Sequence, residues 1–407
     1  MRKNTNTNES TKSACLPIPA DKRMNTEKTK KQGFSRIREY CPLPALIIFA
    51  LTLAAAVSHL VMRFSVGFSD FFCAYVSPAL RLILSSLTGL LPFSLAETVL
   101  IFLPYGLAAF LIYAFRSEKL RSSETADWRF FFSSLALCGL LYSLFVFSFA
   151  AGYSGSTLDE RLDIKGYTES VSAERLTETA ELLAAEASEL SREVLYSSSG
   201  ASVMPYSLDE MKTKLAEAYR SAAEKYDFIP RMPAKVKQIV LSRPMTYTHI
   251  SGVYTYFTGE ANINTNFPDY TLPYTAAHEM SHQRGIAREE EANFMAYLVC
   301  MESDDPYVRY SGCESLLEYV MDALYTADSD AYLRVYYTAL NGNLRRELSA
   351  YSEFFRPYSG SLASAVSGTI NDTFLKTQGQ KAGSQSYGLV VNLAVAYCLG
   401  EETGPAE

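Results

Sequence analysis

Two histidines, His278 and His282, stand four residues apart in the run Thr275-Ala-Ala-His-Glu-Met-Ser-His282. Residues at positions i and i+4 lie on one face of a helix, so both imidazoles can reach one metal ion. Glu279 follows the first histidine, where a carboxylate can take a proton from a metal-activated water and pass it to a leaving amine. This pattern predicts a Zn²⁺ cofactor, with Glu279 as the catalytic residue of a peptide-hydrolysing site.

The third metal ligand must come from outside this segment, because a catalytic zinc ion usually keeps three protein ligands and one open position. Gly285 suits the left-handed residue that ends a helix, after which the chain can turn back. The acidic cluster Glu289, Glu290 and Glu291 can then fold over the metal. Glu289 is preferred because Asn293, one turn further on, can support a ligand histidine from the second shell by accepting its imidazole N–H. Glu291 and then Glu290 are the alternatives.

These residues also have ordinary explanations. A His-Glu-x-x-His pattern is short and arises by chance on amphipathic helices, where the histidines pair with acidic side chains. Three consecutive glutamates are common in the first turn of a helix, because the helix dipole favours negative charge there. The uncharged residues Ala277, Met280 and Ser281 and the following Gly285 favour the metal site.

Two longer runs carry a resemblance to a known family. The segment from Gly252 through Phe257-Thr-Gly-Glu-Ala-Asn-Ile-Asn264, followed by Ala277-His-Glu up to Asn293-Phe, resembles a family of bacterial membrane proteins called domain of unknown function 3810, within the zincin peptidase clan. The resemblance implies a mainly helical α+β, zincin-like catalytic domain with a small edge sheet. An extended substrate would pair with the edge strand above the active-site helix. Residues 252–257 or 261–265 would form that strand.

The resemblance also bears on the third ligand. In the wider glutamate-zincin group this ligand opens a Glu-x-x-x-Asp pattern, which reads Glu289-x-x-x-Asn293 here. Asn replaces Asp, and the gap after His282 is shorter than in most members of that group. The placement of Gly285 is closer to the metzincins, but their third ligand falls on Arg288, which cannot bind a metal.

A hydrogen-bond donor besides the metal is expected to stabilise the transition-state oxyanion. The sequence offers several candidates without choosing among them: His249, Tyr254, Tyr256, and one of Tyr332, Tyr336 and Tyr337. Glu260 is given no catalytic role.

Long apolar runs occupy residues 41–150 and predict a membrane domain. A crossing helix needs about 20 apolar residues, and three segments approach this length: about 42–62, 96–115 and 130–150. The intervening residues 65–95 are semi-apolar and interrupted by Pro78, Gly89 and Pro92. We expect residues 79–91 to lie at the membrane interface as an amphipathic helix, with a re-entrant crossing as the alternative.

Basic residues set the expected orientation. Residues 1–40 carry ten Lys or Arg against four Asp or Glu, and the loop 116–129 adds four basic residues. Both segments are therefore expected on the cytoplasmic side, which makes residues 1–40 a basic cytoplasmic arm, disordered to about residue 35. Three crossings of the cell membrane then place residues 151–407 outside the cytoplasm as an extracytoplasmic domain.

The whole chain has a net charge of −7, but residues 1–40 and the loop 116–129 are basic, which leaves about −14 on residues 151–407. This acidic balance argues against nucleic-acid binding. Helices are expected at 173–195, 208–226, 275–284, 287–302, 313–326, 329–355 and 386–399, and strands at 236–241, 252–257 and 261–265. Cys300, Cys313 and Cys398 are expected to be buried thiols rather than a disulfide framework.

The favoured function is therefore a multi-pass, membrane-anchored zinc metallopeptidase whose partners are a peptide or protein substrate and membrane lipid. The first alternative is a degenerate zincin that binds zinc as an extracytoplasmic sensor or binding module, in which Glu279 is dispensable. The second is a structural membrane protein without metal. An intramembrane protease is disfavoured because Asp269 and the glutamate cluster make the segment too polar for lipid.

Overall fold

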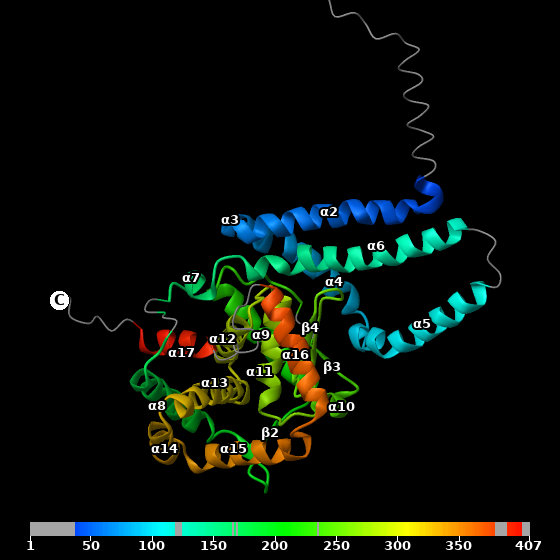
Figure 1. Cartoon of the computed structure of the whole chain (residues 1–407). Helices are drawn as coiled ribbons and strands as arrows, with labels where there is room; N and C mark the ends of the chain where they lie inside the picture. Colours follow the sequence, from blue (N-terminus) through cyan, green and yellow to red (C-terminus); the bar gives the residue numbers. More distant parts are fainter. Residues whose placement is uncertain are drawn as a thin grey trace, which may run out of the picture.

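The computed structural model describes residues 37–118, 124–164, 167, 170–233, 236–378 and 389–400 of the chain. Most of these residues are helical, and two small sheets complete the fold (Figure 1). Of the basic arm predicted over residues 1–40, residues 1–36 lie outside the described residues, and residues 37–40 are helical.

The elements follow one another from an N-terminal group of apolar helices to a larger, mainly helical body. The helices of the first group are α2 (Leu43–Phe64), α3 (Val66–Phe71), η1 (Phe72–Val76), α4 (Ser77–Thr88), α5 (Leu95–Glu118) and α6 (Glu124–Ser148). The helices of the body are η2 (Ala150–Tyr153), α7 (Leu158–Leu162), α8 (Ala173–Leu190), α9 (Leu208–Lys225), α10 (Ser242–Thr246), α11 (Thr271–Gln283), α12 (Glu289–Met301), α13 (Pro306–Ala327), α14 (Ser329–Thr338), α15 (Gly342–Phe355), η3 (Arg356–Tyr358), α16 (Leu362–Thr377) and α17 (Val390–Leu399). The strands are β1 (Leu195–Tyr196), β2 (Ser202–Val203), β3 (Val236–Gln238), β4 (Gly252–Thr255) and β5 (Glu260–Ile263).

Most of the predicted elements of the body are present, with two corrections. The expected single helix 329–355 is two helices, α14 and α15, because Asn341 accepts hydrogen bonds from the backbone of Asn343 and Leu344 and begins a new helix. Helix α16 was not expected. The six described cysteines are free thiols, with Cys300 and Cys313 buried and Cys398 half-buried.

The three-stranded sheet has the order β3-β5-β4. Strand β5 is central, parallel to β3 and antiparallel to β4, with Tyr254 opposite Ala261. Strands β3 and β4 are therefore at the two edges, and β4 lies beside helix α11. Of the two segments expected to form an edge strand, the first has that place and the second is in the middle of the sheet.

Within the part of the chain that the structure describes, three helical stretches are long and apolar enough to cross a membrane: Leu43–Phe64, Val66–Thr88 and Thr125–Ser148. The first and third cover two of the three predicted spans. The remaining predicted span, 96–115, falls on α5, which runs for 24 residues. The stretch Val66–Thr88 stays helical through Pro78 because proline occupies the first turn of α4, after the π-helical turn η1.

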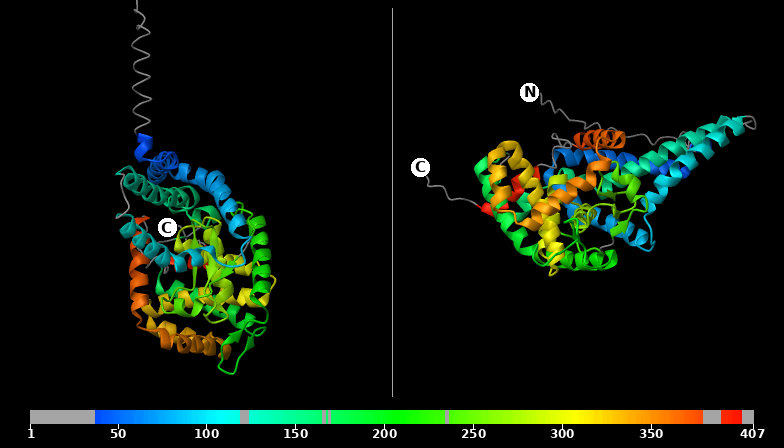
Figure 2. Two further views of the ribbon diagram at one scale, coloured as in Figure 1. Left: turned by 90° about the vertical axis from the view of Figure 1, so that its right-hand side faces the viewer. Right: turned by 90° about the horizontal axis from the view of Figure 1, so that it is seen from below.

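Both ends of the stretch Val66–Thr88 are attached to the body. Near its start, the Asp70 carboxylate accepts hydrogen bonds from the backbone N–H and hydroxyl of Ser156 at 2.9 and 2.8 Å. At its end, the Thr88 hydroxyl donates to the Thr258 carbonyl at 3.1 Å. The stretch therefore runs along the body, whereas α2, α5 and α6 each extend away from it (Figures 1 and 2).

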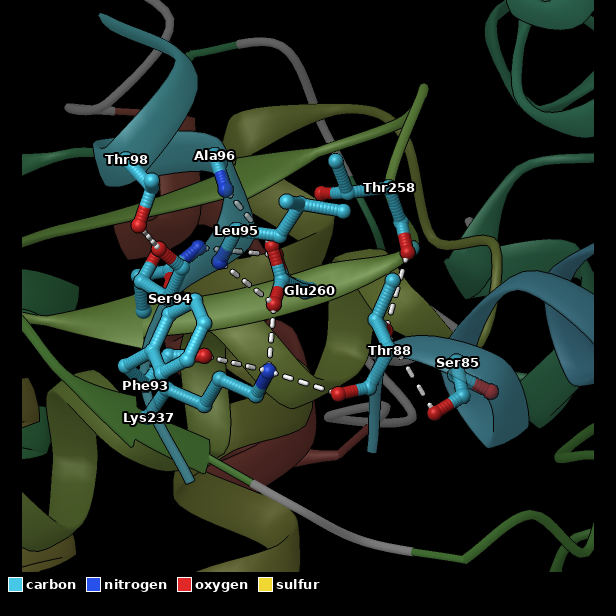
Figure 3. A network of polar contacts seen from close by, with 12 residues as sticks. Ser85, Thr88, Phe93, Ser94, Leu95, Ala96, Thr98, Lys237, Thr258 and Glu260 are labelled. Atoms are coloured by element: carbon cyan, nitrogen blue, oxygen red, sulfur yellow. Dashed lines mark hydrogen bonds and ion pairs between the residues drawn. The ribbon is translucent and has the colours of Figure 1, made fainter. Parts of the chain in front are cut away.

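A buried ion pair joins the start of α5 to the three-stranded sheet (Figure 3). Lys237 on β3 pairs with Glu260 on β5 and donates to the carbonyls of Thr88 and Phe93 at 2.8 and 2.7 Å. The Glu260 carboxylate accepts the backbone N–H groups of Leu95 and Ala96 at 3.0 and 2.9 Å. This network satisfies two of the free N–H groups at the start of α5 and gives Glu260 a structural role.

Candidate metal centre

Helix α11 carries the two histidines through the centre of the body, with almost all of its residues buried. The Tyr219 hydroxyl, from α9, contacts the Ala277 carbonyl and lies 2.8 Å from the Ser281 hydroxyl, which fixes the buried side of the helix. Gly285 ends the turn with a φ of +99°, a conformation that side chains rarely adopt, and a Cβ there would clash with the Arg81 guanidinium. The chain then turns back into α12, as the sequence predicts.

Arg81 is a buried residue of α4 that holds this turn. Its guanidinium donates to the Arg284 carbonyl at 3.1 Å and to the Ser148 carbonyl at 2.6 Å. A cation beside the last carbonyls of α11 also complements the helix dipole. Nothing in the local sequence around Arg81 pointed to this contact, which joins segments far apart in the chain.

The structure brings His278, His282 and Glu289 together. One ligand atom from each lies within 4.8 Å of the others. The Nε2 atoms of His278 and His282 are 3.3 and 3.5 Å from the same Glu289 oxygen. Ligands at about 2.0–2.1 Å from a tetrahedral ion are about 3.4 Å apart, so this donor set fits zinc in both chemistry and spacing.

The ring of His282 is oriented by a second contact. Its Nδ1 lies 2.7 Å from the Ile286 carbonyl, which requires a proton on Nδ1 and leaves Nε2 as the free donor atom. Among the described residues, His278 Nδ1 and the Asn293 amide nitrogen have no hydrogen-bond partner, and both are buried. Asn293 lines the cavity beside His278, the position that the sequence predicts for a supporting residue.

The charges of the three groups depend on one another. Burial disfavours ionisation of Glu289, but His282 and His278 hold the pKa of its carboxyl well below its usual range. Burial also disfavours the charged ring of His282, yet Glu289 and Glu279 raise its pKa to about 9. Burial lowers the pKa of His278, with Glu289 opposing the shift. The pocket therefore holds an ionised carboxylate between two imidazoles, an environment that favours a cation.

Glu279 lies beside this group with only 4% of its surface exposed. Burial raises the pKa of its carboxyl to about 8, while the nearby His282 opposes the shift. Gly252, the first residue of β4, packs directly on it, and a Cβ at Gly252 would come within 2.5 Å of Glu279 Oε1. The glycine therefore allows the edge strand to approach the carboxylate closely. Glu279 Oε2 has no hydrogen-bond partner among the described residues.

The other two glutamates of the cluster lie elsewhere. Glu291 pairs with Arg288 at 2.6 Å and accepts the backbone N–H of Leu158 at 3.0 Å, so it attaches α7 to the body. Glu290 is buried away from the histidines, and burial raises its pKa to about 7. The geometry thus places Glu289, rather than either alternative, at the candidate metal centre.

A cavity of about 1030 Å³ opens onto the three ligands and Glu279. Of the residues considered for the oxyanion, His249, Tyr254 and Tyr256 line this cavity, whereas Tyr332, Tyr336 and Tyr337 do not. The Tyr254 hydroxyl is buried without a hydrogen-bond partner among the described residues, so its donor is unused. His249 is already engaged, with its Nε2 3.0 Å from the Tyr358 carbonyl.

Several other cavity residues were not expected from the sequence. Tyr153, Tyr319 and Glu318 line the cavity from η2 and α13, and Ser364 and Asn371 line it from α16. They come from segments more than 20 residues from the histidines in the chain. Only the three-dimensional fold brings them to the site.

Comparison with known proteins identifies one family. The family described as "Protein of unknown function (DUF3810)" matches residues 72–395. No curated protein and no solved structure matches the chain.

Proposed function

The chain belongs to the DUF3810 family, and we propose that it is a membrane-anchored, zinc-dependent metallopeptidase. The observation that carries the proposal is the meeting of His278, His282 and Glu289 within 4.8 Å, next to the buried carboxylate of Glu279. Three protein ligands leave one open coordination position, as catalytic zinc sites require.

The proposed chemistry divides between the metal and the chain. Zinc at such a site supplies a Lewis acid that acidifies water and polarises a peptide carbonyl. Glu279 accepts a proton from the attacking water and returns it to the leaving amine. Its pKa of about 8 is in the range where a carboxyl group can both accept and release a proton near neutral pH. The Tyr254 hydroxyl, which lacks a hydrogen-bond partner among the described residues, is the proposed donor for the oxyanion.

The edge strand supports a peptide as the substrate. Strand β4 has one side paired with β5 and the other side free, and both Gly252 and Tyr254 line the cavity. An extended peptide can pair with this free edge and bring its backbone close to Glu279. Together with the His-Glu-x-x-His helix, this arrangement is the basis for proposing a zincin-like fold.

The arrangement of the apolar helices supports the expected topology. We assign the membrane crossings to α2, α5 and α6, because each has one end at the body and extends away from it (Figures 1 and 2). The stretch Val66–Thr88 is attached to the body at both ends, so it lies at the surface of the membrane. Three crossings place the basic segments on the cytoplasmic side and the body outside.

Zinc content tests the proposal directly. The full chain, purified in detergent, is expected to hold about one zinc ion, and Glu289→Ala is expected to lose it because two ligands remain. Metal analysis after removal of free zinc measures the content. Glu290→Ala is the matched control, since Glu290 neighbours Glu289 but does not line the cavity, and it should keep the metal. A folded parent chain without zinc would contradict the proposal. Zinc retained in Glu289→Ala would show that Glu289 is not the third ligand.

Asn293→Ala is expected to weaken zinc binding by about 10–100-fold, the usual effect of removing a residue that supports a metal ligand. The cause would be a less well oriented His278, because Asn293 is buried beside that ring. Competition with a zinc-binding dye measures the affinity. Asn343→Ala, on α15 and away from the cavity, is the control. An unchanged zinc affinity in Asn293→Ala would show that Asn293 does not support the metal ligand.

A further inference from the structure

Helix α16 has two different faces. One face lines the cavity above the candidate metal centre through Ser364, Ser367, Gly368 and Asn371. The opposite side carries apolar residues at intervals of four, Leu362, Val366 and Ile370, with 80%, 51% and 65% of their surfaces exposed. Residues at this spacing form one stripe along a helix. The polar face is therefore turned inward and the apolar face outward, the reverse of an ordinary surface helix.

The apolar stripe continues into the helices assigned to the membrane. At the end of α16, Phe374 packs edge-on against Phe145 of α6, with ring centroids 6.2 Å apart. The Arg63 guanidinium at the end of α2 donates to the Thr377 carbonyl at 2.8 Å. These contacts hold the end of α16 against α2 and α6.

The direction of α16 also fits a membrane surface. In Figure 1, α16 runs across the direction of α2 and α6. A helix perpendicular to the crossing helices lies parallel to the bilayer plane, as interfacial amphipathic helices do. The charged residues Asp372 and Lys376 pair with each other at 2.7 Å, off the stripe.

We infer that the stripe Leu362, Val366 and Ile370 rests on the outer surface of the lipid bilayer, with its side chains at the boundary between headgroups and acyl chains. A stripe of exposed apolar side chains of this kind marks a contact with a partner or a membrane, and its continuity with α2 and α6 selects the membrane. One consequence is that α16 lies between the cavity and the lipid. The inference depends on the proposed membrane anchoring but not on the proposed peptidase activity.

Quenching of tryptophan fluorescence by brominated lipid tests the contact. The chain has a single tryptophan, Trp128, so Trp128→Phe provides a background for one new reporter. Ile370→Trp in this background, in the full chain reconstituted into phosphatidylcholine nanodiscs, is expected to lose most of its emission when lipids brominated near the headgroup replace ordinary ones. Because Ile370 is exposed, the substitution disturbs no packing, and Leu362→Trp is a second reporter on the same stripe.

Two reference variants separate the possible outcomes. Leu135→Trp lies on the exposed face of α6 and should be quenched if α6 crosses the bilayer. Leu333→Trp lies on exposed α14, far from α5 and α6 in Figure 1, and should not be quenched. Quenching at Leu135→Trp but at neither α16 position would overturn the inference and leave the anchoring intact. No quenching at Leu135→Trp would overturn the anchoring and the inference together, without bearing on zinc binding or peptidase activity.

Discussion

Glu279→Gln is expected to lower the rate of peptide hydrolysis by about 10²–10⁴-fold, the usual contribution of a general acid–base group, while zinc remains bound. The amide has nearly the same size and shape as the carboxyl group, so the close packing against Gly252 is kept. An amide cannot take a proton from water at neutral pH. The loss should therefore appear in kcat and in kcat/KM to a similar extent, because the interaction is made only in the transition state.

Hydrolysis of a quenched fluorescent peptide library, together with zinc analysis of the same samples, measures this effect. Glu290→Gln is the matched control, since it makes the same chemical change at a buried carboxyl group that does not line the cavity. Full activity in Glu279→Gln with zinc bound would show that Glu279 is not the general base. An inactive parent chain that binds zinc would instead favour the sensor or binding module, in which Glu279 is dispensable.

The part of the site that sequence reasoning found is local in the chain. His278, Glu279 and His282 lie on one helix, and Gly285 and Glu289 follow within seven residues. Helical periodicity and the conformational freedom of glycine fix the arrangement of such neighbours. The sequence alone left Glu291 and Glu290 as alternatives to Glu289 for the third ligand. Only the fold shows that Glu291 pairs with Arg288 and accepts the Leu158 N–H at the start of α7, and so lies away from the histidines.

The remaining features depend on contacts between distant segments. Arg81 reaches the Arg284 carbonyl, 203 residues further along the chain, and no local pattern predicts such a contact. Helix α16 was missed because its sequence mixes small polar and apolar residues. It lacks the apolar, core-facing side from which a surface helix is usually predicted. Its polar face is explained only by the cavity that it covers, and its apolar face by the lipid that we infer.

The stretch Val66–Thr88 shows how a membrane prediction changes with tertiary structure. Its length matches that of α2, 23 residues against 22, but its mean hydropathy is lower, 1.4 against 2.3. The sequence set it apart as semi-apolar and interrupted by Pro78, Gly89 and Pro92. In the structure the helical stretch continues through Pro78 and ends next to Gly89, so Pro78 does not interrupt it. Its contacts with Ser156 and Thr258 at opposite ends are the better argument for a position along the body.

Lys237→Met is expected to destabilise the protein by about 3–5 kcal/mol, since removing one partner of a buried ion pair leaves the other charge unpaired. The side chains of Lys237 and Glu260 are 9% and 1% exposed. The substitution also leaves the carbonyls of Thr88 and Phe93 without the ammonium donor. Because this network joins the sheet to the start of α5, we expect the change to loosen the body from α5.

Thermal unfolding of the full chain in detergent, followed by circular dichroism, measures the loss as a lower midpoint. Arg192→Met is the matched control: it also removes a cation from an ion pair, but Arg192 and Glu189 are 69% and 67% exposed. An exposed pair of this kind contributes about 0–1 kcal/mol. Equal midpoints for the two variants would mean that the Lys237–Glu260 pair does not hold the body to α5. A large loss in Lys237→Met alone is the expected result, because only that variant leaves a buried charge unpaired.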